Sequence, residues 1–229
     1  MGKDEATLRR RKRAAFLIGR ELAGLTVREA RLAGERRRAA SLVHDVYVSC
    51  GYIDAEPEGA RLRVWETLAS TRTLLVERDA LLIGTASLVV DGPHRLPMDE
   101  AFSSELADRR RVRNRIAEVS GLAIDPAHRD FGAFVPLIRE ILRAALASGV
   151  DELVCAVSPK TTHVFTDILL FEKLGAARSY SSKKHDPVVG LRCDLTAIED
   201  RIASAYGAID GELTRIFPLP APVKEEVAA

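Results

Sequence analysis

The sequence predicts an α/β (α+β) fold, in which a mixed central β-sheet is flanked by helices and further helices are added at both ends of the chain. Two β-prone runs, 72–79 and 80–92, are separated by a charged turn, as in an antiparallel hairpin. A third β-prone run, 116–125, feeds a segment at 132–146 whose apolar residues recur at helical spacing. Residues 151–158 are almost continuously apolar, as expected of a strand buried in a parallel sheet.

The N-terminal part of the chain is expected to be helical. Apolar residues at spacings of seven, three and four predict a helix over 5–24. Thr26 and Glu29 have the spacing of a capping box, which predicts a second helix running to about Cys50. A short third helix is expected over 60–68. It should bury three apolar side chains: Leu62, Trp65 and Leu68.

The middle of the chain carries a helix and then the central strand and helix. The helix is expected over 98–111, with three side chains facing inward: Met98, Phe102 and Leu106. Pro126 cannot donate to a ladder and ends the strand at 116–125. The next helix should bury one apolar stripe: Phe134, Leu137, Ile138, Ile141, Leu142 and Ala145. A short strand-to-helix loop directs free backbone N–H groups at the helix N-terminus, a place that favours an anion such as phosphate.

The C-terminal part is expected to contain a helix, two strands and a last helix. The helix covers 161–174, with Gly175 as its cap, and the strands cover 177–182 and 187–195. A capping box at 196–199 then starts an amphipathic helix that runs to Ile216. The chain is accordingly divided into a basic helical N-terminal extension (1–38), a central domain (39–196), and a C-terminal amphipathic helix with a flexible tail (197–229).

Charge and cysteine content narrow the class of protein. Overall charge is close to neutral, but residues 1–40 hold 12 Lys/Arg against 5 Asp/Glu. The three cysteines, Cys50, Cys155 and Cys193, are widely spaced and odd in number, so we expect reduced thiols and no metal site. The apolar run near the N-terminus is too short for a signal peptide or a membrane span, which favours a cytoplasmic protein.

Four phrases, in this order, carry a resemblance to a known family. They are LVHDVYVSCGYI, then LPMDEAF with ELADRRRVRNRIAEVSGLAID, then PKTTHVFTDILLFEKLGAARSY, and finally PVVGLRCDL. Together they resemble the FeeM-like N-acyl amino acid synthases, which have the GNAT acyltransferase fold and are related to the autoinducer synthases. The resemblance covers roughly residues 40–195, so that the central domain is expected to be GNAT-like.

The resemblance implies an acyltransferase. Such enzymes move a long acyl chain from the phosphopantetheine thioester of an acyl carrier protein to the α-amine of an amino acid, without a permanently bound cofactor. The thioester is expected in a V between two splayed parallel strands, 118–125 and 152–158. Two rivals remain open: a coenzyme A-dependent GNAT enzyme acting on another amine, and a non-catalytic module that binds an acylated carrier or lipid.

Glu118 is the candidate general base. An α-amine is mostly ammonium at neutral pH and must lose a proton before it attacks a thioester. A carboxylate in a partly apolar cleft, with its pKa raised by desolvation, can take that proton. The alternative is a strand-end glutamate that faces solvent or pairs with Arg115.

The donor is expected to meet the strand at 122–124 and the loop that follows it. Backbone amides of the strand are candidates for binding the thioester oxygen, although an ordinary buried strand has the same sequence. The candidate thioester and phosphopantetheine residues are Leu122, Ala123, Ile124, His128, Arg129, Gly132 and Ala133. Phe134 stands where the coenzyme A-binding pattern has a small residue, and Asp130 adds a negative charge. Both departures favour a carrier-protein arm over coenzyme A.

Other departures from the family concern the acid and the acceptor. Thr166 stands where the family phrase often has tyrosine, so His163 becomes the candidate general acid. Leu170 replaces the usual glycine before the phenylalanine that follows it. Asp99 and Glu100 are candidates for binding the acceptor amine, with the alternative that they only complement the dipole of a helix N-terminus.

The basic arm, Arg9–Arg13 with Arg36–Arg38, has three open roles. It docks an acidic acyl carrier protein, it makes peripheral contact with anionic lipid at the inner membrane face, or it is a solvated helix surface. Nucleic acid is not expected, because the arm has few aromatic residues to stack on bases.

Overall fold

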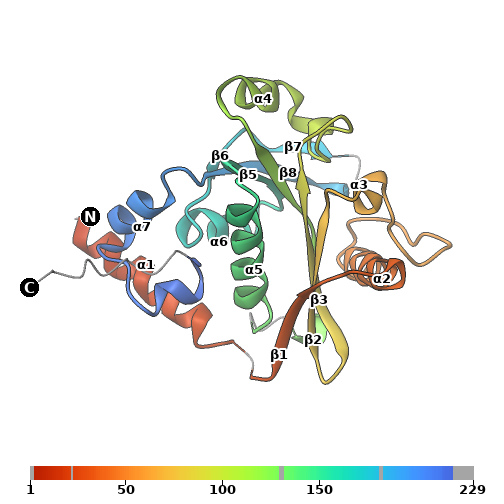
Figure 1. Ribbon diagram of the computed structural model, residues 1–229, viewed down its shortest axis with the longest axis horizontal. Helices are drawn as coiled ribbons and strands as arrows, with labels where there is room; N and C mark the ends of the chain where they lie inside the picture. The colour runs from red at the N-terminus through yellow and green to blue at the C-terminus, as the bar shows by residue number, and fades with distance from the viewer. Residues whose placement is uncertain (1–2, 22, 129–131, 181–182, 219–229) are drawn as a thin grey trace, which may run out of the picture.

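The computed structural model describes residues 3–21, 23–128, 132–180 and 183–218. Its strands are β1 (Leu25–Glu29), β2 (Arg72–Arg78), β3 (Leu81–Val90), β4 (Ile116–Ile124), β5 (Glu152–Val157), β6 (Glu172–Lys173), β7 (Arg178–Tyr180) and β8 (Lys183–Asp194). They form an eight-stranded sheet in the order β1-β2-β3-β4-β5-β8-β6, with β7 paired to β8 (Figure 1). β4 and β5 run parallel, whereas their outer neighbours pair antiparallel, so the expected mixed sheet is confirmed.

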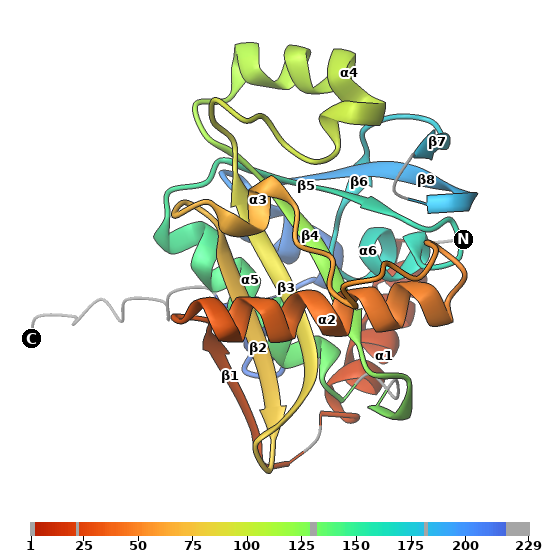
Figure 2. The same cartoon turned by 90° about the vertical axis from the view of Figure 1, so that its right-hand side faces the viewer.

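Helices cover both faces of the sheet. They are α1 (Lys3–Ile18), α2 (Ala33–Ser49), α3 (Val64–Thr67), α4 (Asp99–Val112), α5 (Phe134–Ala147), α6 (Thr162–Asp167) and α7 (Ile198–Tyr206), with short 3₁₀ turns at 126–128 and 213–215. α5, α1 and α7 lie on one side of the sheet, and α2 and α3 lie on the other (Figures 1 and 2). The whole apolar stripe expected for α5 is buried.

The hairpin and the central elements are confirmed with nearly the expected bounds. β2 and β3 pair antiparallel, and β4 leads through a short turn toward α5. α4 buries Met98, Phe102 and Leu106 completely, against Ile116 of β4 and other residues of the sheet. These elements were predictable because each has a long periodic pattern of apolar residues.

The expected helix over 26–50 is wrong in its first part. Leu25–Glu29 is an edge strand, because Thr26 and Val27 are β-branched and pair with β2. Glu29 forms an ion pair with Arg72 (2.9 Å) instead of capping a helix. The helix starts at Ala33, where the Glu35 carboxylate accepts from the backbone N–H groups of Arg31 and Leu32 (2.7 and 3.0 Å).

The expected helix over 60–68 is also wrong for most of its length. Only Val64–Thr67 is helical; residues 60–63 lie outside any helix, and Arg63 has an extended backbone (φ −102°, ψ 168°). Side chains in an extended segment alternate, so Arg61 is turned inward and Leu62, which is 41% exposed, is turned outward. This reversal places a guanidinium group where an aliphatic side chain was expected.

The helix expected over 161–174 stops at Asp167. Leu170 adopts φ 61°, a left-handed conformation that glycine takes readily and leucine does not. The chain therefore turns, and β6 pairs with β8 in place of a fourth helical turn. The family's glycine before Phe171 fits this backbone, and Leu170 occupies it at a cost of about 1 kcal/mol.

The last helix is shorter than expected. It runs from Ile198 to Tyr206, and the capping box at its start is absent because the Thr196 hydroxyl donates to Asp194 (2.6 Å). Gly207, at φ 81°, ends it. Of the apolar residues expected on its inner face beyond this point, Leu213 and Ile216 are nevertheless buried, whereas Ile209 is exposed. The tail at 219–229 lies outside the described residues.

Two glycines allow α4 to pack closely against the sheet. A Cβ on Gly190 would lie 2.8 Å from the Phe102 ring, and one on Gly175 would lie 3.0 Å from it. Gly175 therefore makes room for an aromatic ring, and is not the helix cap that was expected. The helix bends at Phe102 (φ −127°, ψ 31°), and its first turn, beginning with Met98, is held against β4.

Several arginines of the N-terminal basic arm form hydrogen bonds and ion pairs with other parts of the chain. Arg10 Nε donates to the Asp167 carbonyl at the end of α6 (2.7 Å), and Arg11 Nε donates to the Tyr206 carbonyl at the end of α7 (2.6 Å). Arg13 forms an ion pair with the Asp167 carboxylate. Cations at helix C-termini are favourable, so these arginines fasten α1 to the C-terminal part. Among the described helices, none is long and apolar enough to cross a membrane.

Candidate active site

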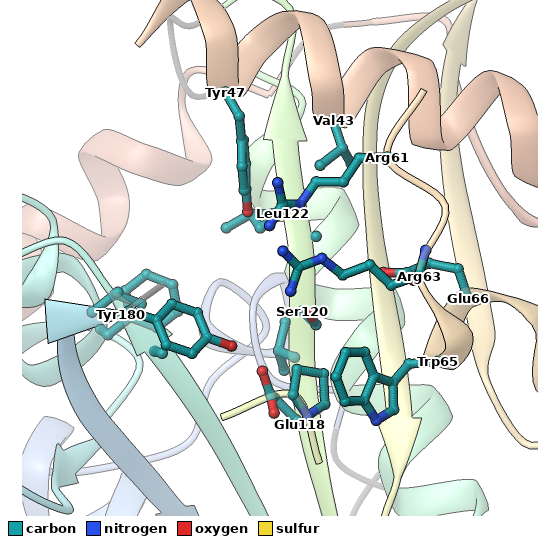
Figure 3. A pocket seen from close by; sticks show the side chains of 16 residues that line it. Val43, Tyr47, Arg61, Arg63, Trp65, Glu66, Glu118, Ser120, Leu122 and Tyr180 are labelled. Carbon is teal, nitrogen blue, oxygen red and sulfur yellow. The ribbon is translucent and has the colours of Figure 1, made fainter. Parts of the chain in front are cut away.

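A polar cavity lies beside β4, close to where that strand separates from β5 (Figure 3). The two strands pair only at Ile116–Glu152, Ala117–Leu153 and Glu118–Val154, although β4 continues for six more residues. The expected divergence of the parallel strands is thus present. The cavity has a volume of 80 Å³ and includes among its lining residues Tyr47, Arg61, Arg63, Trp65, Glu66, Glu118, Leu122 and Tyr180.

Glu118 faces this cavity and is almost completely buried, with 3% of its surface exposed. Its Oε2 accepts a hydrogen bond from the Met98 N–H (2.8 Å) at the start of α4. Among the described residues, no cation forms an ion pair with it, and burial raises its pKa from 4.5 to about 8. The nearby carboxylates of Asp99 and Glu66 contribute to this rise. Glu118 therefore neither faces solvent nor pairs with Arg115.

The β4 backbone is irregular next to Glu118. The ladder with β3 shifts register between Thr85 and Ser87, and Gly121 at this bulge adopts φ 60°. A bulge redirects backbone groups and commonly lies next to a functional site. Leu122 follows it and lines the polar cavity. This is the segment expected to hold the thioester carbonyl.

A second, apolar cavity adjoins the first and has a volume of 350 Å³. The two share the lining residues Tyr47, Leu122, Ala156, Val157 and Phe165. The apolar cavity runs between α2, the far end of β4 and α6, and its further lining residues include Val46, Cys50, Ala123, Ile124, Phe134 and Val164. All three strand residues predicted to contact the thioester therefore line it: Leu122, Ala123 and Ile124.

Several cavity residues were missed from the sequence, and Arg61 and Arg63 are the most important. Both guanidinium groups point into the polar cavity (Figure 3). The pKa of Arg61 lies below its usual range, because burial and the neighbouring Arg63 disfavour its charge. The signal was the spacing of Arg61 and Arg63, since residues two apart share one side of an extended segment.

Two tyrosines were also missed. Tyr180 lines the polar cavity from β7, and its hydroxyl points toward the centre (Figure 3). Tyr47 lies on α2 between the two cavities, and burial raises its pKa to about 12. Tyr180 comes from a strand 62 positions after Glu118 in the chain, so sequence proximity could not reveal it.

The other predicted site residues are placed as follows. His163 is exposed and lines neither of these two cavities, and Thr166 makes a hydrogen bond to the Thr162 carbonyl (3.2 Å). Asp99 binds Arg110 through both oxygens (2.7 and 2.6 Å), and Glu100 is exposed on the first turn of α4. None of these four is brought to the Glu118 cavity.

The expected phosphate cradle is only partly described. Arg129 and Asp130 lie outside the described residues. His128 ends the 3₁₀ turn after β4, with its Nδ1 3.8 Å from Asp125 Oδ1. Gly132 and Ala133 precede α5, and Ala133 is fully buried. Phe134 lines the apolar cavity and meets the Phe165 ring edge-on at 6.3 Å.

Comparison with known proteins identifies the family. The profile of the family described as "N-acyl amino acid synthase FeeM" matches residues 38–194. The structure of FeeM, an N-acyl amino acid synthase from uncultured soil microbes, has 25% sequence identity and a TM-score of 0.70. That likeness covers 81% of this chain and 98% of FeeM. No curated protein matches the chain.

More distant structures share the fold. The AHL synthase LasI is 16% identical, with a TM-score of 0.59 over 81% of this chain and 96% of LasI. The acetyltransferase-like yncA from Salmonella typhimurium, solved with acetyl-CoA, is 18% identical, with a TM-score of 0.53 over 75% of this chain and 94% of that one. The expected GNAT-like fold is confirmed. The chain belongs to the FeeM N-acyl amino acid synthase family and is an acyltransferase.

Proposed function

We propose that this protein is an N-acyl amino acid synthase that takes a long acyl chain from the phosphopantetheine thioester of an acyl carrier protein. The observation that carries the proposal is Glu118, a buried carboxylate without a cation partner among the described residues, whose pKa is raised to about 8. Such a group is poised to exchange protons near neutral pH. It lines a polar cavity, suited to an amine, and that cavity adjoins an apolar cavity, suited to an acyl chain.

The reaction follows from this arrangement. Glu118 takes a proton from the ammonium of the acceptor, and the free amine attacks the carbonyl carbon of the thioester. The C–N bond forms, the nitrogen loses its second proton to water as the tetrahedral intermediate collapses, and the C–S bond breaks, so that the products are an amide and the phosphopantetheine thiolate. Backbone N–H groups at the Gly121 bulge are the candidates for binding the oxyanion, and such donors contribute several kcal/mol.

The leaving thiolate must finally be protonated. Tyr180 is a better candidate for this acid than His163, because its hydroxyl points into the cavity that contains Glu118 (Figure 3). A thiolate is a good leaving group, so the acid contributes less than the base does. The absence of a tyrosine at Thr166 therefore does not argue against turnover.

The donor is proposed to be a carrier protein in preference to coenzyme A. Phe134 is the first residue of α5, and its ring is packed against Phe165. A bulky group at this helix start opposes the close approach that the pyrophosphate of coenzyme A requires. A carrier-protein arm brings a single phosphodiester and is less affected.

The test is mass spectrometry of lipid extracts from cells that overproduce the protein. New N-acyl amino acids are expected, and their masses identify both the acyl chain and the acceptor. Purified protein is then supplied with palmitoyl carrier protein or palmitoyl-coenzyme A, and faster transfer from the carrier protein is expected. Failure to form any amide from either donor would contradict the proposal.

A further inference from the structure

The Arg61 guanidinium is buried without full compensation. The residue is 7% exposed, and its Nη2 has no hydrogen-bond partner among the described residues. Nη1 lies 3.6 Å from Glu56 Oε1, beyond hydrogen-bond distance, and the guanidinium carbon lies 5.9 Å from the centre of the Tyr47 ring. A buried charge with unused donors is expensive, so such a group indicates a missing partner of opposite charge.

The unused donors face the polar cavity. Figure 3 shows the guanidinium groups of Arg61 and Arg63 at one end of it and the Glu118 carboxylate at the other. Glu66 also lines the cavity but lies at the arginine end, where its Oε2 accepts from the Arg63 N–H (2.9 Å) and where burial raises its pKa. One end of the cavity therefore has two guanidinium groups with Glu66 beside them, and the other end has Glu118, which forms no ion pair with a described residue.

This charge distribution matches one class of molecule. An amino acid carries an ammonium and a carboxylate on the same carbon, whereas a simple amine carries only the ammonium. Arginine presents a planar fork of N–H donors that fits a carboxylate in bidentate geometry. A ligand with a carboxylate would satisfy Arg61 Nη2 and neutralise the buried guanidinium.

We propose that Arg61 binds the α-carboxylate of the acceptor, and that it thereby makes the enzyme select amino acids over amines of the same side chain. The inference rests on the proposed function and deepens it, because it assigns selection of the acceptor to a residue that does not take part in the proton transfer or the attack on the thioester. With the carboxylate on Arg61, the acceptor's amine is directed toward Glu118. Arg63, which is less buried, is a secondary contributor at the same end of the cavity.

The test compares acceptors that differ only in the carboxylate: phenylalanine with phenethylamine, leucine with isoamylamine, and alanine with ethylamine. Wild-type protein is expected to prefer the best amino acid over its matched amine. Arg61→Met should lower kcat/KM for the amino acid by about 100-fold, mostly through KM, and leave the matched amine within about threefold. For Arg61→Lys, kcat/KM for the amino acid should lie between the values for wild type and Arg61→Met, because lysine retains the positive charge without the planar fork of donors.

Two controls separate binding from folding. Arg111→Gln removes a guanidinium that is 75% exposed and does not line the cavity, and it should leave the rates with both acceptors unchanged. Arg61→Met should melt no lower than the wild type, because it removes a buried guanidinium that the half-exposed Glu56 carboxylate, at 3.6 Å, compensates only in part. Equal losses for the amino acid and the amine, or a clear fall in melting temperature, would show that Arg61 is only structural and would overturn the inference.

A binding measurement keeps the inference independent of turnover. Calorimetry without donor is expected to detect binding of the amino acid to wild-type protein, with binding of the matched amine and binding to Arg61→Met both much weaker. If this pattern holds while no amide is formed from any donor, the proposed function fails and the carboxylate site stands. If transfer occurs but Arg61→Met does not discriminate between the acceptors, the function stands and the inference fails.

Discussion

Two buried glutamates on neighbouring parallel strands have opposite surroundings. Glu118 of β4 and Glu152 of β5 are 3% and 0% exposed, and each lies at an end of the same three-pair ladder. Arg109 binds Glu152 through both carboxylate oxygens (2.7 and 2.6 Å), and Arg113 and Arg192 each approach to 3.5 Å. Within the described part of the chain, Glu118 accepts one hydrogen bond, from the backbone N–H of Met98.

The difference shows that burial alone does not make a carboxylate reactive. Glu152 is neutralised by cations from α4 and β8, and these ion pairs link α4 and β8 to β5. Glu118 is buried to nearly the same degree but forms no ion pair with any described residue, so its proton affinity rises instead. The first arrangement stabilises the fold, and the second supplies a base.

Replacing Glu118 with glutamine should have the largest effect. Glu118→Gln keeps the shape of the side chain and removes the base, so kcat/KM for acyl transfer should fall by about 1,000-fold. Stability should be retained, because glutamine is buried without charge. Steady-state kinetics of thiol release and thermal unfolding measure the two properties. A loss of less than about tenfold would remove Glu118 from the mechanism.

Glu152→Gln should show the reverse pattern. Breaking a buried ion pair leaves arginines uncompensated, and the free energy of unfolding should fall by about 3 kcal/mol. The rate of transfer by the folded protein should change by only a few-fold, because the strand position of Glu118 is unaltered. Urea unfolding with a parallel activity assay tests this. Unchanged stability would mean that the Glu152 cluster does not hold α4 to the sheet.

The pH dependence of stability should distinguish the two carboxylates. Folding raises the pKa of Glu118 from 4.5 to about 8, so the folded state binds this proton more tightly than the unfolded state does. The resulting stabilisation is complete below pH 4.5 and is lost as the pH rises through 8. Relative to Glu118→Gln, wild-type protein should lose about 2 kcal/mol between pH 5 and 7. Parallel stability curves for the two proteins would contradict the raised pKa.

Arg110→Met should have the smallest effect. Arg110 binds Asp99 and Asp91, and these ion pairs hold the first turn of α4, from which Met98 donates to Glu118. Without Arg110, the Asp99 carboxylate is less neutralised and should raise the pKa of Glu118 further. We expect kcat/KM at pH 7 to fall by about fivefold, with most of the loss recovered at higher pH. A loss that does not depend on pH would indicate a purely structural role.

The sequence predicted much of the fold, because α4, β4, α5 and β5 have long apolar patterns. It also singled out Glu118, a carboxylate within an apolar strand, because of its position in the family resemblance. It could not distinguish Glu118 from Glu152, since the cation that distinguishes them, Arg109, lies 43 residues away on α4. Arg61 was missed for another reason: a helical period was assumed where the chain is extended, and this exchanged the buried and exposed residues.

The most direct measurement of the central claim is the pH dependence of kcat/KM for transfer to one amino acid, determined for wild-type protein and Glu118→Gln. Ionisation of the acceptor's amine affects both proteins equally, so the ratio of their rates isolates Glu118. The account predicts that this ratio rises with pH, with a midpoint near pH 8, the pKa to which burial raises Glu118. A ratio that is independent of pH would contradict the claim that Glu118 is the base.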